Sequence, residues 1–161
     1  MKEQFIDRGK RSTKEGFALG LLKSAEKNPQ IFGIGSDITS SVGMDLFAKN
    51  FPERFISLGI AEQNAAAVSA GLALMNKIPV FSSYAVFSTF RAADQIRVSI
   101  CYNNLKVIIG GAHAGLSVGP DGATHQALED IALMRVLPNM TVLSPCDATQ
   151  TEKILLAAIE N

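Results

Sequence analysis

Short apolar runs alternate with longer stretches of helical periodicity along nearly the whole chain. The runs with the length and character of buried strands are residues 31–35, 54–59, 78–84, 105–111 and 140–145. The helical patterns occupy residues 13–28, 61–76, 90–103, 125–137 and 147–161. This alternation is typical of right-handed crossovers between parallel strands. It predicts an α/β fold with a parallel sheet and helices on both faces.

Length and charge narrow the kind of protein. The 161 residues suit one domain, with residues 1–12 as an N-terminal extension, and the 15 basic and 15 acidic residues cancel. A neutral balance predicts neither a nucleic-acid nor a membrane partner, and the apolar run 65–75 is too short to span a bilayer. Cys101 and Cys146 lie far apart, and the N-terminus lacks an apolar signal core. We therefore expect a cytoplasmic protein with reduced thiols.

Four polar or aromatic clusters directly follow the first four predicted strands. They are residues 35–41, 59–64, 84–90 and 112–126. In parallel sheets, ligands bind beyond the carboxyl ends of the strands, which lie at one edge. The four clusters are therefore expected to form one rim around a ligand.

Glu62 is the single carboxylate in the apolar stretch 57–74. A buried carboxylate is costly unless it is paired or hydrogen-bonded. Its position at the start of a predicted helix favours a simple interaction with the helix dipole. Arg91, Asp94 and Arg97 are spaced for ion pairing along another helix face.

Aromatic residues and histidines supply the other candidates. Tyr84, Phe87 and Phe90 have the i, i+3, i+6 spacing of core residues, although their place after a strand leaves room for a flat ligand. His113 and His125 fall in one glycine-rich loop. His125 follows Asp121 by four residues. Two ligands are too few to argue a metal site, so none is predicted.

Taken together, the clusters resemble the pyrimidine-binding domain of transketolase, a thiamine-diphosphate enzyme. The segment "LGIAEQN" is similar to the one that bears the family's invariant glutamate, and "SYAVFSTFRAADQIR" to the one whose aromatic residues hold the aminopyrimidine ring. The segment "AHAGLSVGPDGATHQALEDIALMRVLPNM" resembles the family's long histidine-containing stretch. The likeness runs from about Thr13 to the end of the chain and is closest to the C-terminal subunit of split transketolases.

The resemblance implies roles on the cofactor side of the site. Glu62 matches the glutamate that shares a proton with ring nitrogen N1′ of the aminopyrimidine, so that the neighbouring 4′-amino group can act as the base for the C2 proton. Phe87 matches the ring that stacks on the aminopyrimidine. Tyr84 and Phe90 match its aromatic neighbours, and Asp37 belongs to a loop that faces the thiazolium.

On the substrate side, His113, Asp121 and His125 match residues that contact sugar hydroxyls or lie near the sugar phosphate. The two histidines would also assist proton transfers. Ser41 lies in the loop that faces the substrate channel. Lys14 stands where the family often has an arginine for the substrate phosphate.

The resemblance also implies what the chain needs from elsewhere. The family holds the diphosphate and Mg²⁺ with a GDG motif that this sequence lacks. The pyrophosphate-binding and C-terminal domains are therefore expected on a partner or another part of the protein, and the isolated chain is expected to be inactive. The implied reaction transfers a two-carbon ketol unit between sugar phosphates, as in the pentose phosphate pathway, in a dimer or other homo-oligomer.

Three interpretations stay open from the sequence. The first is the pyrimidine half of a transketolase. The second is a piece of 1-deoxyxylulose-5-phosphate synthase or of a 2-oxoacid dehydrogenase β-subunit. The third is a non-catalytic assembly module that retains the fold.

Overall fold

A four-stranded parallel sheet forms the centre of the molecule in a computed structural model that describes residues 9–161. The first eight residues of the expected N-terminal extension lie outside this range. The strands are β1 (Ile31–Gly35), β2 (Phe55–Ser57), β3 (Ile78–Tyr84) and β4 (Ile108–Ala112), in the spatial order β2-β1-β3-β4. All three strand pairs are parallel, with Gly35 opposite both Ser57 and Ser82, and Tyr84 opposite Ala112. The predicted α/β class is confirmed.

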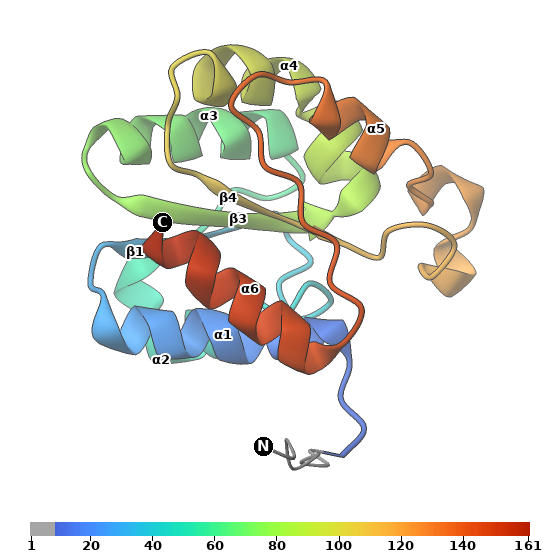
Figure 1. Cartoon of the computed structure of the whole chain (residues 1–161), viewed down its shortest axis with the longest axis horizontal. Helices are drawn as coiled ribbons and strands as arrows, with labels where there is room; N and C mark the ends of the chain where they lie inside the picture. The colour runs from blue at the N-terminus through green and yellow to red at the C-terminus, as the bar shows by residue number, and fades with distance from the viewer. Residues whose placement is uncertain (1–8) are drawn as a thin grey trace, which may run out of the picture.

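Helices cover both faces of the sheet, as Figure 1 shows. One layer holds α1 (Thr13–Lys27), α2 (Asp45–Asn50) and α6 (Ala148–Glu160), and the opposite layer holds α3 (Glu62–Leu74), α4 (Ala93–Gln95) and α5 (Asp130–Arg135). The shorter turns are η1 (Pro52–Arg54), η2 (Phe87–Arg91), η3 (Ile96–Cys101), η4 (Gly119–Asp121) and η5 (Ala123–His125). Of these, η2 and η3 are π-helical. None of the helices within residues 9–161 has the length and apolar character needed to cross a membrane.

Local sequence explains where α1 begins. The Ser12 hydroxyl accepts a hydrogen bond from the Glu15 amide at 3.2 Å, and the Glu15 carboxylate accepts one from the Ser12 amide at 2.6 Å. This reciprocal capping box satisfies two backbone donors that a helix start leaves free. The Ser12 amide also lowers the pKa of Glu15 below its ordinary value.

Apolar side chains fill the space between the sheet and each helical layer. Leu21, Ile31, Phe47, Val80 and Leu155 form one core cluster together with further buried neighbours from α1, α6 and the segment just before α2. On the other face the apolar residues that α3 buries are all alanines, and they pack within two clusters whose buried members are Ala66, Ala70, Ala92, Ile96, Ile100, Cys101 and Met134 in one and Ile34, Ala65 and Phe81 in the other. Small residues on α3 allow that helix to lie close to the sheet, which fixes the position of Glu62 at its first turn.

The predicted strand at residues 140–145 is wrong, because no strand is described there. Asn139 has a left-handed φ of 60° just before this segment, and Pro145 ends it. Proline cannot donate to a strand ladder, and the turn at Asn139 redirects the chain. In Figure 1 the segment instead carries the chain from the layer of α5 to the layer of α6.

Two predicted helices are also interrupted. The pattern at residues 90–103 is divided among two π-helical segments and the short α4. The pattern at residues 125–137 is helical over Asp130–Arg135 alone. Its first part is diverted because the Gly115 amide donates to the Ala127 carbonyl at 2.7 Å, in an isolated antiparallel bridge. Backbone pairing across the loop therefore outweighs the helical periodicity.

The crossing of α1 and α6 depends on Gly16. A methyl group added at Gly16 would overlap with the backbone carbonyl of Ala148, whereas one added at Gly71 on α3 would meet nothing within 4 Å. We expect Gly16→Ala to lower the free energy of unfolding by about 1–3 kcal/mol, because the two backbones must separate. The matched variant Gly71→Ala should raise it by about 0.5–1 kcal/mol. Urea denaturation of both variants checks this, and equal stabilities would contradict the close packing.

Candidate functional site

All four strands end at one edge of the sheet, and a cavity of about 390 Å³ lies there. Each of the four clusters that follow the strands contributes to its wall. The lining residues are Ser36, Asp37, Ile38, Ile60, Glu62, Tyr84, Phe87, Arg91, Thr124 and His125. A small-molecule site typically encloses about 300–1,000 Å³. The structure thus brings the four segments to one site of suitable size.

Glu62 is the first residue of α3 and lies at the cavity wall with 2% of its surface exposed. The Ser83 hydroxyl donates to its Oε1 at 3.1 Å, and Arg91 Nη1 donates to its Oε2 at 2.7 Å. These described side-chain hydrogen bonds come from β3 and η2, not from the free backbone amides of α3. The carboxylate is therefore held by neighbouring elements in a position that the helix dipole alone does not explain.

Neither hydrogen-bond partner of Glu62 is predicted from the sequence. Arg91 was expected to pair with Asp94 along its own helix, and this expectation is wrong because its described ion pair is with Glu62. Ser83 had a usable signal, since Ser82 and Ser83 are polar residues within the predicted strand 78–84. In the structure Ser83 is 0% exposed. A buried hydroxyl needs a partner, and the nearby carboxylate provides it.

Aromatic rings form a second part of the wall. The rings of Tyr84 and Phe87 lie nearly parallel, with centroids 6.2 Å apart and an interplanar angle of 12°. The His125 ring meets Phe87 edge-on at 5.1 Å and Tyr84 at 6.1 Å. Phe90 is 45% exposed and does not line the cavity. Of the three expected aromatic residues, Tyr84 and Phe87 line the cavity together with His125, and Phe90 lies outside its wall.

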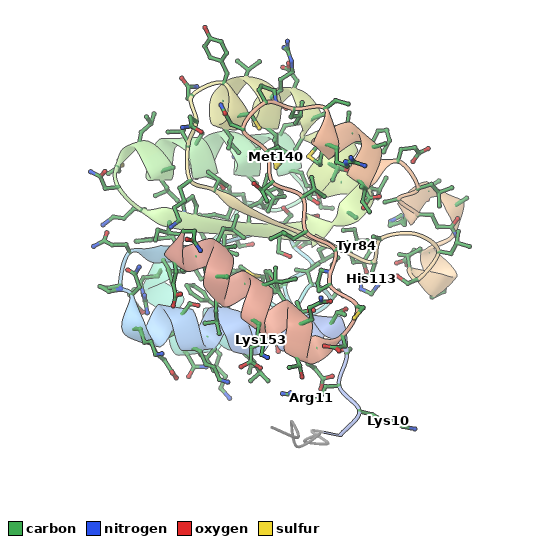
Figure 2. All side chains as sticks on the ribbon, in the orientation of Figure 1. Lys10, Arg11, Tyr84, His113, Met140 and Lys153 are labelled. Atoms are coloured by element: carbon green, nitrogen blue, oxygen red, sulfur yellow. The ribbon has the colours of Figure 1, made fainter. Side chains whose placement is uncertain are left out.

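His113 lies beside the cavity rather than in its wall. Its Nε2 is 3.2 Å from the carbonyl oxygen of Ser41, and its ring meets Tyr84 edge-on at 4.7 Å. Figure 2 shows Tyr84 and His113 next to each other at the end of the sheet. His113 has a left-handed φ of 53°, a conformation that is uncommon for residues other than glycine and is often held in place at functional sites. Contact with Ser41 and Tyr84 fixes the ring in this turn.

The remaining candidates differ in their distance from the site. Asp37 lines the cavity and also has a left-handed φ, of 64°. Asp121 is exposed in η4, and Lys14 is exposed near the start of α1 against the loop at Gly43; neither lines the cavity.

Within residues 9–161 no three His, Cys, Asp or Glu side chains lie together as metal ligands would. Cys101 and Cys146 are free, and burial raises the pKa of the Cys101 thiol.

Ser36 is a further residue that was missed from the sequence. It is 2% exposed, lines the cavity, and its hydroxyl has no hydrogen-bond partner among the described residues. Buried hydroxyl groups are usually satisfied. An unsatisfied hydroxyl at a cavity wall is suited to a polar group of a bound ligand.

Known proteins with similar sequences share this domain. A solved structure of a split gene transketolase, an inactive beta4 tetramer, is 48% identical, with a TM-score of 0.83 over 95% of this chain and 49% of that chain. One subunit of the apulose-4-phosphate transketolase of Phocaeicola vulgatus is 37% identical over 91% of this chain and 47% of that protein. The 1-deoxy-D-xylulose-5-phosphate synthase of Shouchella clausii is 44% identical over 89% of this chain and 22% of that protein.

The chain thus spans about half the length of the shorter relatives and less than a quarter of the synthase. The match to a family is nevertheless nearly complete, since residues 9–161 match the family described as "Transketolase, pyrimidine binding domain". The chain belongs to this pyrimidine-binding domain family of transketolases, a thiamine-diphosphate-dependent family.

Proposed function

We propose that the chain is the pyrimidine-binding part of a transketolase-type enzyme that transfers a two-carbon ketol unit between sugar phosphates. One observation carries the proposal: the Glu62 carboxylate is 2% exposed and lies at the wall of a cavity that Tyr84, Phe87 and His125 also line. Taking a carboxylate out of water carries a desolvation cost even when it is paired, as Glu62 is with Arg91 and Ser83. Its cost is explained if the site uses the carboxylate in catalysis.

The residues present fit an aminopyrimidine ring. Phe87 offers an aromatic face, Glu62 an acceptor for a protonated ring nitrogen, and Ser36 an unused hydroxyl. The bound cofactor, thiamine diphosphate, would supply the carbanion chemistry that amino-acid side chains lack. The protein's own contribution is to orient the ring, exclude water and move a proton.

Each cofactor-side residue has a separate task in this proposal. Glu62 holds a proton at N1′ of the ring, and Ser83 keeps Oε1 in place while it does so. Phe87 stacks on the ring, and Tyr84 supports Phe87 from its side. Asp37 faces the thiazolium end from the loop after β1. Phe90 is proposed as an outer aromatic neighbour, closed off when another subunit covers its exposed ring.

The substrate-side residues occupy the loop after β4 and the loops near it. His125, in the cavity wall, is placed to contact a sugar hydroxyl and to exchange a proton with it. His113 and Ser41, which contact each other, would lie along the channel. Asp121 and Lys14, both exposed, would contact the far end of the sugar phosphate, with Lys14 as the cation for the phosphate.

The proposal assigns the diphosphate and Mg²⁺ to a pyrophosphate-binding domain or subunit that packs against this chain. Large apolar side chains at both ends of α3 support such an interface: Ile60, Leu74 and Met75 are 74%, 69% and 68% exposed. A contact that covered these side chains would remove their apolar surface from water, which favours association. We propose a homo-oligomeric assembly in the cytoplasm, in which this chain forms one domain.

One observation favours the alternative activity, that of a 1-deoxyxylulose-5-phosphate synthase. The Shouchella clausii relative named as 1-deoxy-D-xylulose-5-phosphate synthase is 44% identical over 145 residues. That name implies chemistry that starts from a different donor, so the two candidates differ in their substrates. A non-catalytic assembly module is the third possibility, and the intact cavity with its buried Glu62 speaks against it.

A reconstitution experiment tests the proposal. We expect the chain mixed with a pyrophosphate-binding partner subunit, thiamine diphosphate and Mg²⁺ to transfer ketol units from a ketose phosphate to an aldose phosphate. The chain alone should show no transfer and no micromolar binding of thiamine diphosphate by calorimetry, because it would offer contacts to one ring of the cofactor. Turnover of pyruvate in place of the ketose phosphate would favour the synthase interpretation, and no turnover of either would favour the assembly module.

A further inference from the structure

The planar guanidinium group of Arg91 makes two contacts at the site. Its Nη1 donates to Glu62 Oε2 at 2.7 Å, and its guanidinium carbon lies 4.2 Å from the centre of the Phe87 ring. Arg91 also lines the cavity. One guanidinium thus uses both the buried carboxylate and an aromatic face at the site.

These are the two contacts that the proposed function gives to the aminopyrimidine ring. A guanidinium and a protonated aminopyrimidine are both flat, and both present N–H donors in their plane. Both also stack on an aromatic face. A ring that donates to Oε2 above Phe87 would overlap with the guanidinium, so the two groups compete for the same place.

The two side chains of this ion pair differ in their exposure to solvent. Glu62 is 2% exposed at the first turn of α3, whereas the Arg91 side chain is 40% exposed. A carboxylate left buried without a partner would be strongly destabilising. Ser83 donates to Oε1 in either case, so Arg91 is the group that neutralises the charge and satisfies Oε2 when no ligand is bound, and its own charge can return to water when a ligand replaces it.

We propose that Arg91 is a placeholder for the aminopyrimidine ring: its guanidinium holds Glu62 and Phe87 in the cofactor-free protein and leaves Oε2 when the ring binds. This inference rests on the proposed function and adds a residue that opposes cofactor binding. The apparent affinity for the cofactor then equals the intrinsic affinity multiplied by the fraction of free molecules in which Arg91 has already left Oε2.

The test uses Arg91→Met, which keeps an unbranched stem and removes the cation. Arg97→Met is the matched control, because Arg97 is exposed in η3 and does not line the cavity. In the assembly with the partner subunit, Arg91→Met should bind thiamine diphosphate roughly tenfold more tightly by calorimetry, the factor expected if Arg91 blocks the ring about nine-tenths of the time. The same variant should melt at a lower temperature than wild type without cofactor, and should gain more on adding it. The control should change neither property.

Opposite directions for stability and affinity are the signature of a placeholder. If Arg91→Met binds the cofactor as weakly as wild type, or more weakly, while the wild-type assembly binds and exchanges the C2 proton normally, the inference is overturned and the proposed function stands. If the wild-type assembly itself does not bind thiamine diphosphate, the proposed function fails and the inference fails with it.

A second measurement needs no variant. The side-chain Nε–H signal of Arg91 can be followed by NMR in the wild-type assembly while thiamine diphosphate is added. We expect this signal to shift to the position and rapid solvent exchange of a solvent-exposed arginine as the site saturates. A signal that stays unchanged at saturation would overturn the inference, even if Arg91→Met did not fold.

Discussion

Glu62→Gln is expected to slow deuterium exchange at C2 of thiamine diphosphate by about 10²–10⁴-fold in the assembled enzyme, the usual range for loss of a general acid or base. The change keeps the shape of a side chain that is 2% exposed, and it keeps an acceptor for the Ser83 hydroxyl. What it removes is the exchangeable carboxyl proton and the negative charge. The exchange rate, followed by NMR, reads the proton step directly and does not depend on any sugar.

The helix-dipole interpretation of Glu62 gives a different expectation. A carboxylate that only complements the first turn of α3 is worth about 0.3–1 kcal/mol of stability, and its loss leaves the chemistry unchanged. The variant should also lose the ion pair with Arg91, so a lower melting temperature alone does not separate the two interpretations. The exchange rate separates them, because the dipole does not act on C2.

A matched variant controls for the loss of one negative charge. Glu26 is exposed on α1 and does not line the cavity. Glu26→Gln should exchange the C2 proton at the wild-type rate. If Glu62→Gln does so too, the buried carboxylate has no part in the proton step, and the central role proposed for it is wrong.

The fold follows closely from patterns that are local in the sequence. The four strands that were predicted correctly are apolar runs bounded by glycine, proline or polar residues, and their parallel orientation follows from the helical stretches between them. One failure arises where a distant backbone group decides the local structure. The segment 125–129 has helical periodicity, but the Ala127 carbonyl pairs with the Gly115 amide across the loop. No local pattern contains that hydrogen bond.

The candidate site was predictable to the level of segments, but not to the level of contacts. The rule that ligands bind beyond the carboxyl ends of parallel strands is enough to place Glu62, Phe87 and His125 at one edge from the sequence alone. The partners of Glu62 lie 21 and 29 residues away in the sequence, on β3 and η2. Which side chain meets a buried carboxylate depends on the crossing of α3, β3 and a π-helical turn, and sequence spacing does not encode that crossing.

His125→Ala should lower ketol transfer by about 10²–10⁴-fold while leaving C2 proton exchange nearly intact. The His125 ring meets Phe87 edge-on, with ring centroids 5.1 Å apart, and lies in η5 on the loop after β4; the described side-chain hydrogen bonds of Glu62 are with Ser83 and Arg91 instead. A side chain in that position can reach a bound sugar without touching the ring nitrogen that Glu62 serves. Loss of its imidazole should therefore affect the steps that involve the sugar hydroxyls.

Two further variants in the same loop sharpen this prediction. The Thr124 hydroxyl lies 2.8 Å from His125 Nδ1, so Thr124→Val should misorient the imidazole and give a smaller loss of transfer. Ser117→Ala removes an exposed hydroxyl bonded to the Ala114 carbonyl and should leave both steps unchanged. Comparing steady-state transfer with C2 exchange in the three variants separates the sugar steps from the cofactor step. An exchange rate that falls as far as the transfer rate in His125→Ala would mean that His125 acts on the cofactor, and would remove it from the substrate side of the site.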